Sequence, residues 1–169
     1  MEISILSKSS IRIKGKSSVL SVDPTQKTEC NAVILLANET SGVKINDEDV
    51  VFNGPGEYEA GGVKITGYRV ESDLAFSINI DSINLTLGKL STLSKFQNKL
   101  KEANILVVNC NELIDASFLT SMASSVIIFY GEKAAEVGKA IGAENVKNLS
   151  KYATTIDKLP AEVETVILE

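Results

Sequence analysis

The sequence predicts an α+β protein in which β-sheets pack together and helices lie outside them. Two observations predict this class. Short stretches rich in β-branched residues, typical of strands, fill the first half of the chain. Apolar runs alternate with segments of helical period in the second half. No repeat, linker or low-complexity segment separates the two halves, so we expect residues 1–169 to form a single domain.

Eight strands are expected in the first half, at residues 2–6, 10–14, 18–23, 32–37, 49–53, 62–70, 74–81 and 83–88. The sequence KGKS (14–17) predicts a hairpin turn, and so does the pair Asp81-Ser82. The stretch AVILLA (32–37) is apolar on both faces, which predicts a central strand covered above and below. A polar loop follows it, and such loops often carry the chemistry of a protein.

The second half begins with a predicted helix at 91–103, where Leu93, Phe96 and Leu100 form one apolar stripe and Ser91 or Thr92 can cap the start. Buried strands are expected at 104–109 and 125–130, with a short helix at 115–123 between them. A further helix at 132–142 ends at Gly142. Strands at 152–156 and 164–169, joined by a turn containing Pro160, complete the chain.

The composition narrows the range of partners. Hydrophobic residues make up 44% of the chain, and the absence of Trp leaves the core to Ile, Leu and Val. The net charge is −5 and the basic residues are scattered, so neither nucleic acid nor an anionic membrane is expected as a partner. The apolar runs are far shorter than the roughly 20 residues of a membrane helix. With no signal peptide visible, we expect a cytoplasmic protein.

The chain contains no histidine. Histidine is the usual general base near neutral pH and the commonest transition-metal ligand, so a Ser-His-Asp triad, a Cys-His pair and a His-based zinc site are excluded. Cys30 and Cys110 are far apart and are interpreted as free, structural thiols. Carboxylate, lysine, tyrosine or cysteine chemistry remains.

The sequence GPGEY (54–58) predicts a rigid bend, because proline fixes its own φ and the flanking glycines permit positive φ. A ligand-binding loop is the alternative interpretation. We interpret these residues as a structural corner that leads into the strand at 62–70; they are Gly54, Pro55, Gly56, Glu57 and Tyr58.

With its surroundings, this stretch resembles the small metal-dependent hydrolases of the metallo-β-lactamase fold. The resemblance covers nearly the whole chain in order, through VLSVDP (19–24), GPGEYE (54–59), GVKITG (62–67), TLGKL (86–90), NILVVN (104–109), SVIIFYG (125–131) and KLPAEVETVILE (158–169). It implies an αββα four-layer sandwich of reduced size.

The resemblance also implies where metal ligands would lie. The four ligand places of the His-x-His-x-Asp-His motif fall on Ala37, Glu39, Ser41 and Gly42, the bridging aspartate on Lys89, and a further histidine on Phe129. Another ligand histidine has no counterpart at residues 69–73. A catalytic zinc needs about three protein ligands, so we expect no metal, no cofactor and no catalytic residue. The residues at the former ligand places are expected to line a vestigial pocket together with Asp23 and Asn38. The expected lining is Asp23, Ala37, Asn38, Glu39, Ser41, Gly42, Lys89 and Phe129.

One hypothesis gives the pocket a new charge arrangement: the Lys89 ammonium stands in for the missing metal, with Asp23 and Glu39 as its partners. In the alternative, all three side chains point into water.

Two functions are therefore considered. The first is a non-catalytic protein that keeps the fold for binding or self-association, with a homo-oligomer as one outcome and its small-molecule ligand unknown. The second is a hydrolase with non-standard, His-free chemistry. The residues available to such a hydrolase are Lys89, Tyr58, Glu39, Glu57 and Cys110.

Overall fold

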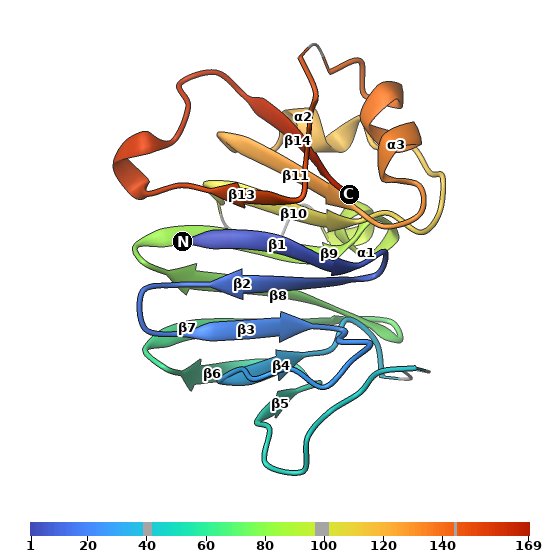
Figure 1. Cartoon of the computed structure of the whole chain (residues 1–169). Helices are drawn as coiled ribbons and strands as arrows, with labels where there is room; N and C mark the ends of the chain where they lie inside the picture. The colour runs from blue at the N-terminus through green and yellow to red at the C-terminus, as the bar shows by residue number, and fades with distance from the viewer. Residues whose placement is uncertain (39–41, 97–101, 144) are drawn as a thin grey trace.

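Figure 1 shows the computed structural model of the chain, which describes residues 1–38, 42–96, 102–143 and 145–169. Two β-sheets lie face to face. Most of the first sheet is formed before the chain enters the second, and the last strands return once to each sheet. No helix among the described residues is both long and apolar enough to cross a membrane.

The first sheet has six strands in the order β13-β1-β2-β3-β4-β5. Neighbours from β13 to β3 pair antiparallel, whereas β3, β4 and β5 run parallel. The expected turn at 14–17 joins β2 to β3, where the Gly15 amide donates to the Ser18 carbonyl over 2.8 Å. The bounds are β1 (Glu2–Ser7), β2 (Ser10–Lys14), β3 (Val19–Val22), β4 (Ala32–Ile34), β5 (Val51–Phe52) and β13 (Lys151–Ala153).

The second sheet has eight strands in the order β12-β14-β11-β10-β9-β8-β7-β6. The strands β6 to β9 are antiparallel neighbours, and β9, β10, β11, β14 and β12 are parallel. Asp81 and Ser82, both with positive φ, turn β8 into β9 as expected. The bounds are β6 (Gly56–Ala60), β7 (Val63–Val70), β8 (Asp73–Ile80), β9 (Ile83–Lys89), β10 (Ile105–Asn109), β11 (Val126–Tyr130), β12 (Lys147–Leu149) and β14 (Glu164–Leu168).

The helices lie on the outer face of the eight-stranded sheet. They are α1 (Leu90–Phe96), α2 (Phe118–Ser121) and α3 (Ala134–Ala140), and a 3₁₀ turn, η2 (Ile156–Lys158), lies between β13 and β14. Leu93, Leu119 and Val137, one from each helix, are buried in a cluster with the outward side chains of that sheet. This cluster forms the second hydrophobic layer of the molecule.

The layer outside the six-stranded sheet differs from the expected one, because the described residues place no helix there. Loop segments cover part of that face instead. Thr28 donates through its hydroxyl to Ser21 of β3, and its carbonyl accepts from the Asn46 amide. The outward side chain of Val33 in β4 is therefore only 1% exposed. The sandwich keeps its two sheets, and the fourth layer is made of loops.

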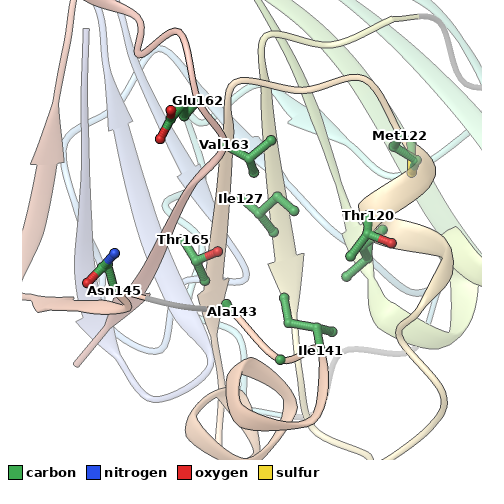
Figure 2. Close-up of a pocket in the computed structure, with 11 residues that line it drawn as sticks. Thr120, Met122, Ile127, Ile141, Ala143, Asn145, Glu162, Val163 and Thr165 are labelled. Atoms are coloured by element: carbon green, nitrogen blue, oxygen red, sulfur yellow. The ribbon is translucent and has the colours of Figure 1, made fainter.

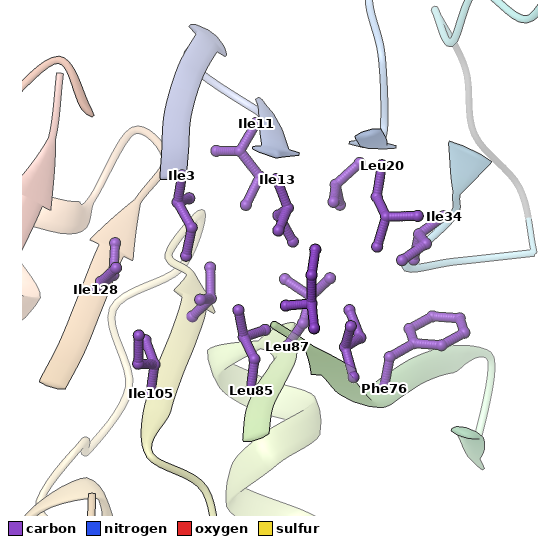
Figure 3. Close-up of a cluster of buried hydrophobic side chains, with 14 of the residues drawn as sticks. Ile3, Ile11, Ile13, Leu20, Ile34, Phe76, Leu85, Leu87, Ile105 and Ile128 are labelled. Carbon is purple, nitrogen blue, oxygen red and sulfur yellow. The ribbon is translucent and has the colours of Figure 1, made fainter. Parts of the chain in front are cut away.

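The main core lies between the two sheets. Because side chains alternate along a strand, every second residue of each sheet points inward. Figure 3 shows Ile3, Ile11, Ile13, Leu20 and Ile34 of the first sheet facing Phe76, Leu85, Leu87, Ile105 and Ile128 of the second. Full burial of one such side chain is worth about 1.5–3 kcal/mol, so this cluster holds the sheets together.

Several expected elements differ in extent. The strand expected at 32–37 ends at Ile34, and β4 is not central, since only β5 separates it from the sheet edge. The helix expected at 115–123 shortens to α2, and that at 91–103 is described only as far as Phe96, so Leu100 lies outside the described residues. The strand expected at 152–156 ends at Ala153.

Two strands were not expected at all. The edge strand β6 begins within the predicted bend, and β12 is a short edge strand. β12 spans three residues, two of them polar, and β6 begins with a glycine of the bend and contains two glutamates, so the strand pattern in the sequence is short and weak. The predicted helix stop is confirmed at Gly142, which has a φ of +67°.

Candidate functional site

Three neighbouring parallel strands end at one rim of the sandwich and present polar side chains there. Lys89 ends β9, Asn109 ends β10 and Tyr130 ends β11, and the register places Asn109 opposite both of the others. The carboxyl ends of parallel strands meet at the same edge of a sheet, where α/β proteins commonly place their sites. This rim is the candidate site.

Asp73, the first residue of β8, is the partner of Lys89. The Lys89 Nζ donates to Asp73 Oδ1 over 2.8 Å, with the two side chains 32% and 25% exposed. The Thr92 hydroxyl of α1 approaches the second carboxylate oxygen at 3.4 Å. The ion pair is therefore partly shielded from water and held by elements on three sides.

The chain segment after β4 joins the two sheets at this rim. The Leu36 amide donates to Asp23 Oδ1 over 3.1 Å, and the Leu36 carbonyl accepts from the Leu74 amide of β8 over 2.9 Å. Ala37 forms an isolated antiparallel bridge with Asp73. Asp23, which follows β3, thus lies across the inter-sheet gap from the Lys89–Asp73 pair.

Asp23 is the most perturbed carboxyl group of the rim. Burial raises its pKa from 3.8 to about 6, although the Leu36 amide and the nearby Lys89 charge both lower it. The negative charge of Asp73 adds to the increase. Asp23 also has a φ of +43°, a left-handed conformation that aspartate tolerates better than most residues.

Beneath the rim lie two buried polar groups without hydrogen-bond partners among the described residues. Tyr130 is fully buried and Asn109 is 3% exposed, yet neither the Tyr130 hydroxyl nor the Asn109 Oδ1 is paired. Burial raises the pKa of the Tyr130 phenol well above its ordinary value, and Asp23 raises it further. Asn109 lies close enough to oppose this shift, but the two side chains do not reach hydrogen-bonding geometry.

A small polar cavity opens at the same rim. It has a volume of about 150 Å³ and is lined by Lys89, Leu90, Ser91, Asn109, Asn111 and Glu112. Asn111 lies against Gly131, where an added Cβ would come within 2.9 Å of the Asn111 Oδ1. Gly131 has a φ of +109°, so both the backbone and the neighbouring amide require glycine there.

The other residues expected in the pocket lie in different places. Asn38 is exposed, and its Oδ1 accepts from Arg69 Nη1 over 2.8 Å; Gly42 is also exposed, with a φ of +86°. Phe129 points away from the rim into the cluster beneath α3, and its neighbour Tyr130 faces the inter-sheet core instead. Glu39 and Ser41 lie outside the described residues.

Among the described residues, Lys89 donates its hydrogen bond to Asp73 and not to Asp23; Glu39, the other expected partner, lies outside the described residues. Asp23 interacts with Lys89 through charge only. The position of Asp73 beside Lys89 could have been predicted from the sequence. The turn at Asp81-Ser82 sets the β8–β9 register, and that register brings the end of β9 beside the start of β8.

The residues at 54–58 form a self-supporting corner. The Tyr58 hydroxyl donates to the carbonyls of Gly54 and Pro55 over 3.0 and 3.2 Å. Its ring stacks on Phe52 with 4.5 Å between centroids. A Cβ at Gly67 would meet the Gly54 carbonyl oxygen at 2.4 Å, so β7 must pass this corner without a side chain. These contacts favour the structural interpretation over a ligand-binding loop.

The cysteines offer no reactive thiolate. Cys110 is fully buried, and burial raises its pKa to about 12. Burial also raises the pKa of Cys30, where the charge of Asp49 adds to the effect. A nucleophilic thiol needs a lowered pKa, so Cys110 does not fit the nucleophile role considered for it.

The described residues of the rim do not fit a catalytic metal. The described residues contain no group of three His, Cys, Asp or Glu side chains that could hold an ion, and the whole sequence lacks histidine. An ammonium group stands among the carboxylates and neutralises part of their charge. Two carboxylates and an ammonium do not make the nitrogen- or sulfur-rich ligand set that zinc prefers.

Solved structures of known proteins share this architecture. A Thermotoga maritima protein whose description proposes a zinc-dependent hydrolase of the metallo-β-lactamase superfamily matches with a TM-score of 0.75 and 16% identity, over 100% of this chain and 99% of that one. The chain has the metallo-β-lactamase fold. At these identities the likeness concerns the fold.

Two further structures extend the comparison. A proposed metal-dependent hydrolase from Parabacteroides distasonis matches the metallo-β-lactamase fold of this chain with a TM-score of 0.59 and 14% identity, over 99% of this chain and 93% of that one. The diiron β-hydroxylase CmlA from Streptomyces venezuelae matches with a TM-score of 0.53 and 6% identity. The match covers 85% of this chain and 47% of CmlA. No family model and no curated protein matches the sequence.

A second, larger cavity lies on the outer face of the eight-stranded sheet, between α2, the end of α3 and the start of β14. Its volume is about 340 Å³. Figure 2 shows Met122, Ile127 and Ile141 gathered with Val163 and with polar groups such as Thr165. It opens beside the amino-terminal ends of β11 and β14 and is separate from the rim that carries Lys89.

Proposed function

We propose that this protein is a non-catalytic binding module of the metallo-β-lactamase fold, in which an internal ion pair takes the place of a metal centre. The Lys89–Asp73 pair, at 2.8 Å, is the observation that carries the proposal. Lys89 stands where the family resemblance implies a bridging aspartate. A fold does not transmit an activity once its site residues are replaced.

Charge supports this proposal. A divalent cation about 4 Å from the Lys89 ammonium would meet a repulsion of about 8 kcal/mol at an effective dielectric constant of about 20. Asp73 is already engaged by Lys89 and Thr92, and Asp23 accepts the Leu36 amide. Asp73 and Asp23 therefore have partners without an ion.

Metal analysis tests the proposal. We expect substoichiometric zinc, manganese and magnesium in the purified protein, a melting-temperature shift below about 1 °C with each ion, and no metal-stimulated hydrolysis of ester, phosphodiester or β-lactam substrates. Stoichiometric metal, or hydrolysis that chelation abolishes, would contradict it.

Replacing the ammonium provides a sharper comparison. Lys89→Asp places a third carboxylate beside Asp73 and Asp23, so this variant is expected to gain a Mn²⁺-dependent rise in melting temperature. Lys95→Asp makes the same charge change in the exposed pair with Glu71 and should not gain one. A Mn²⁺ response of equal size in both variants, or in neither, would argue against an ion-pair replacement at the rim.

A second candidate function, a His-free hydrolase, is favoured by the pKa of about 6 at Asp23, since shifted pKa values gather at functional sites. With Asp23 as a general base, hydrolysis in the presence of EDTA should rise with pH through about 6 and disappear in Asp23→Asn. The absence of any EDTA-resistant turnover, or a rate unaffected by Asp23→Asn, excludes this candidate.

Self-association is also part of the proposal, and light scattering of the full chain tests it. The exposed large apolar side chains come from different segments of the chain; they are Leu6, Val50, Leu113, Ile156 and Val163. A concentration-independent monomer mass would restrict the proposed function to ligand binding.

A further inference from the structure

We propose that the cavity at the carboxyl ends of β9 and β10 binds a small zwitterion of the α-amino acid type. The inference rests on the proposed function as a binding module and names the class of ligand for its site. The ligand carboxylate would lie against Lys89, and its ammonium group would lie against Glu112 and the amide oxygens of Asn109 and Asn111.

Size limits the ligand first. The cavity measures about 150 Å³, and one water molecule occupies about 30 Å³ of liquid. The cavity therefore has the size of a small ligand such as glycine, alanine or serine.

The charges select a ligand with two signs. Lys89 has three ammonium protons and donates one of them to Asp73, so protons remain for an oxygen of the ligand. Glu112, on the loop after β10, contributes a carboxylate to the same lining. A simple anion would be attracted by Lys89 but repelled by Glu112 and Asp73. A simple cation would be attracted by the two carboxylates but repelled by Lys89. A zwitterion matches both ends.

A buried, unpaired group supports a ligand at this position. Asn109 lines the cavity and is 3% exposed; its polar neighbour is the buried Tyr130 hydroxyl, and its Oδ1 makes no well-aligned hydrogen bond among the described residues. Buried polar atoms are nearly always paired. A ligand N–H group within reach of this amide, by a small rotation of its side chain, would supply the missing donor.

Titration of the full chain with glycine, L-alanine and L-serine, followed by NMR amide shifts and calorimetry, tests the proposal. Saturable binding is expected for at least one of them, with shifts concentrated at residues 89–91 and 109–112. Acetate and methylamine, each carrying one half of the zwitterion, should bind at least about tenfold more weakly, because each leaves one charged side chain unpaired.

Variants locate the site. Lys89→Gln and Glu112→Gln should each weaken binding by about tenfold, since each removes one charge-assisted hydrogen bond. Lys64→Gln and Glu59→Gln make the same changes at the distant β6–β7 edge and should bind like the unchanged protein. Circular dichroism of every variant separates lost binding from lost folding, and Glu112, on an exposed loop, can be changed without disturbing the core.

The outcomes are distinct from those that test the proposed function. No binding of any amino acid at 50 mM (about fifty times a dissociation constant of 1 mM), or acetate binding as tightly as glycine, overturns this inference and leaves the non-catalytic proposal standing. Metal-dependent turnover overturns the proposed function whether or not amino acids bind. Equal losses in the rim and β6–β7 variants would also overturn the inference.

Discussion

At Asp23 a carboxyl group lies partly buried between two sheets, and its environment favours the protonated form. The pKa of Asp23 rises from 3.8 to about 6. The folded state therefore binds more protons than the unfolded state between these two values, and stability falls as pH rises through this window. Above about pH 6 the loss of folding stability is constant, because Asp23 is ionised in both the folded and the unfolded state.

Asp23→Asn tests this linkage. Asparagine keeps an oxygen that can accept the Leu36 amide but carries no charge. At pH 8 we expect the variant to be more stable than the parent by about 3 kcal/mol, and at pH 4 the difference should fall below about 1 kcal/mol. Urea unfolding at both pH values measures the difference. Asp157→Asn removes a carboxyl group from exposed η2 and is the control for the loss of one negative charge.

Individual residues also mark how far the sequence could predict the site. The order of the motifs in the resemblance places Lys89 on the strand at 83–88 or directly after it, and Lys89 is the last residue of β9. The resemblance misplaces the side chain of Phe129, since an offset of one residue reverses the face in a strand. Tyr130 is the residue that faces Asp23, and only the packing of β11 decides this.

At the scale of elements, the corner and β6 show how a short motif supports a strand. Tyr58 holds the bend through its hydroxyl and packs against Phe52 through its ring. The proline and glycines make the bend predictable from sequence. The strand that follows is not predictable, because β6 pairs on one side only and exposes Glu57 and Glu59.

Tyr58→Phe separates the two contributions. Phenylalanine keeps the stacking on Phe52 and removes the hydrogen bonds to Gly54 and Pro55. We expect a loss of about 1 kcal/mol in the free energy of unfolding, and Tyr58→Ala should lose roughly 3 kcal/mol because the ring is lost as well. Equal losses for the two variants would show that the hydroxyl, and not the stacking, stabilises the corner.

At the scale of the whole molecule, one hydrophobic cluster contains side chains of both sheets. Neither sheet can bury its inward face without the other. The expectation of a single domain therefore becomes a prediction of one cooperative unfolding transition.

Leu85→Ala tests this cooperativity. Leu85 is fully buried between the sheets, so the variant should lose about 2–5 kcal/mol. In the unchanged protein, circular dichroism and tyrosine fluorescence should report the same urea midpoint. The two signals should also agree with each other in the Leu85→Ala variant. Leu113→Ala, at a side chain that is 56% exposed, should change stability by less than about 0.5 kcal/mol. Two separate transitions would indicate that the sheets unfold independently.

The sequence by itself determined most strands, the turns at 14–17 and 81–82, the helix stop at Gly142 and the absence of histidine. These features depend on local chemistry: the alternation of apolar side chains, residues that tolerate positive φ, and residue identity. The order of the β-strands and the loop layer outside the first sheet were decided by tertiary structure. Tertiary structure also decided the Lys89–Asp73 pair, the burial of the Tyr130 hydroxyl and the cavity beside Asn109. Contacts between segments far apart in the chain depend on how two sheets bury each other's faces, and no short stretch of sequence contains that information.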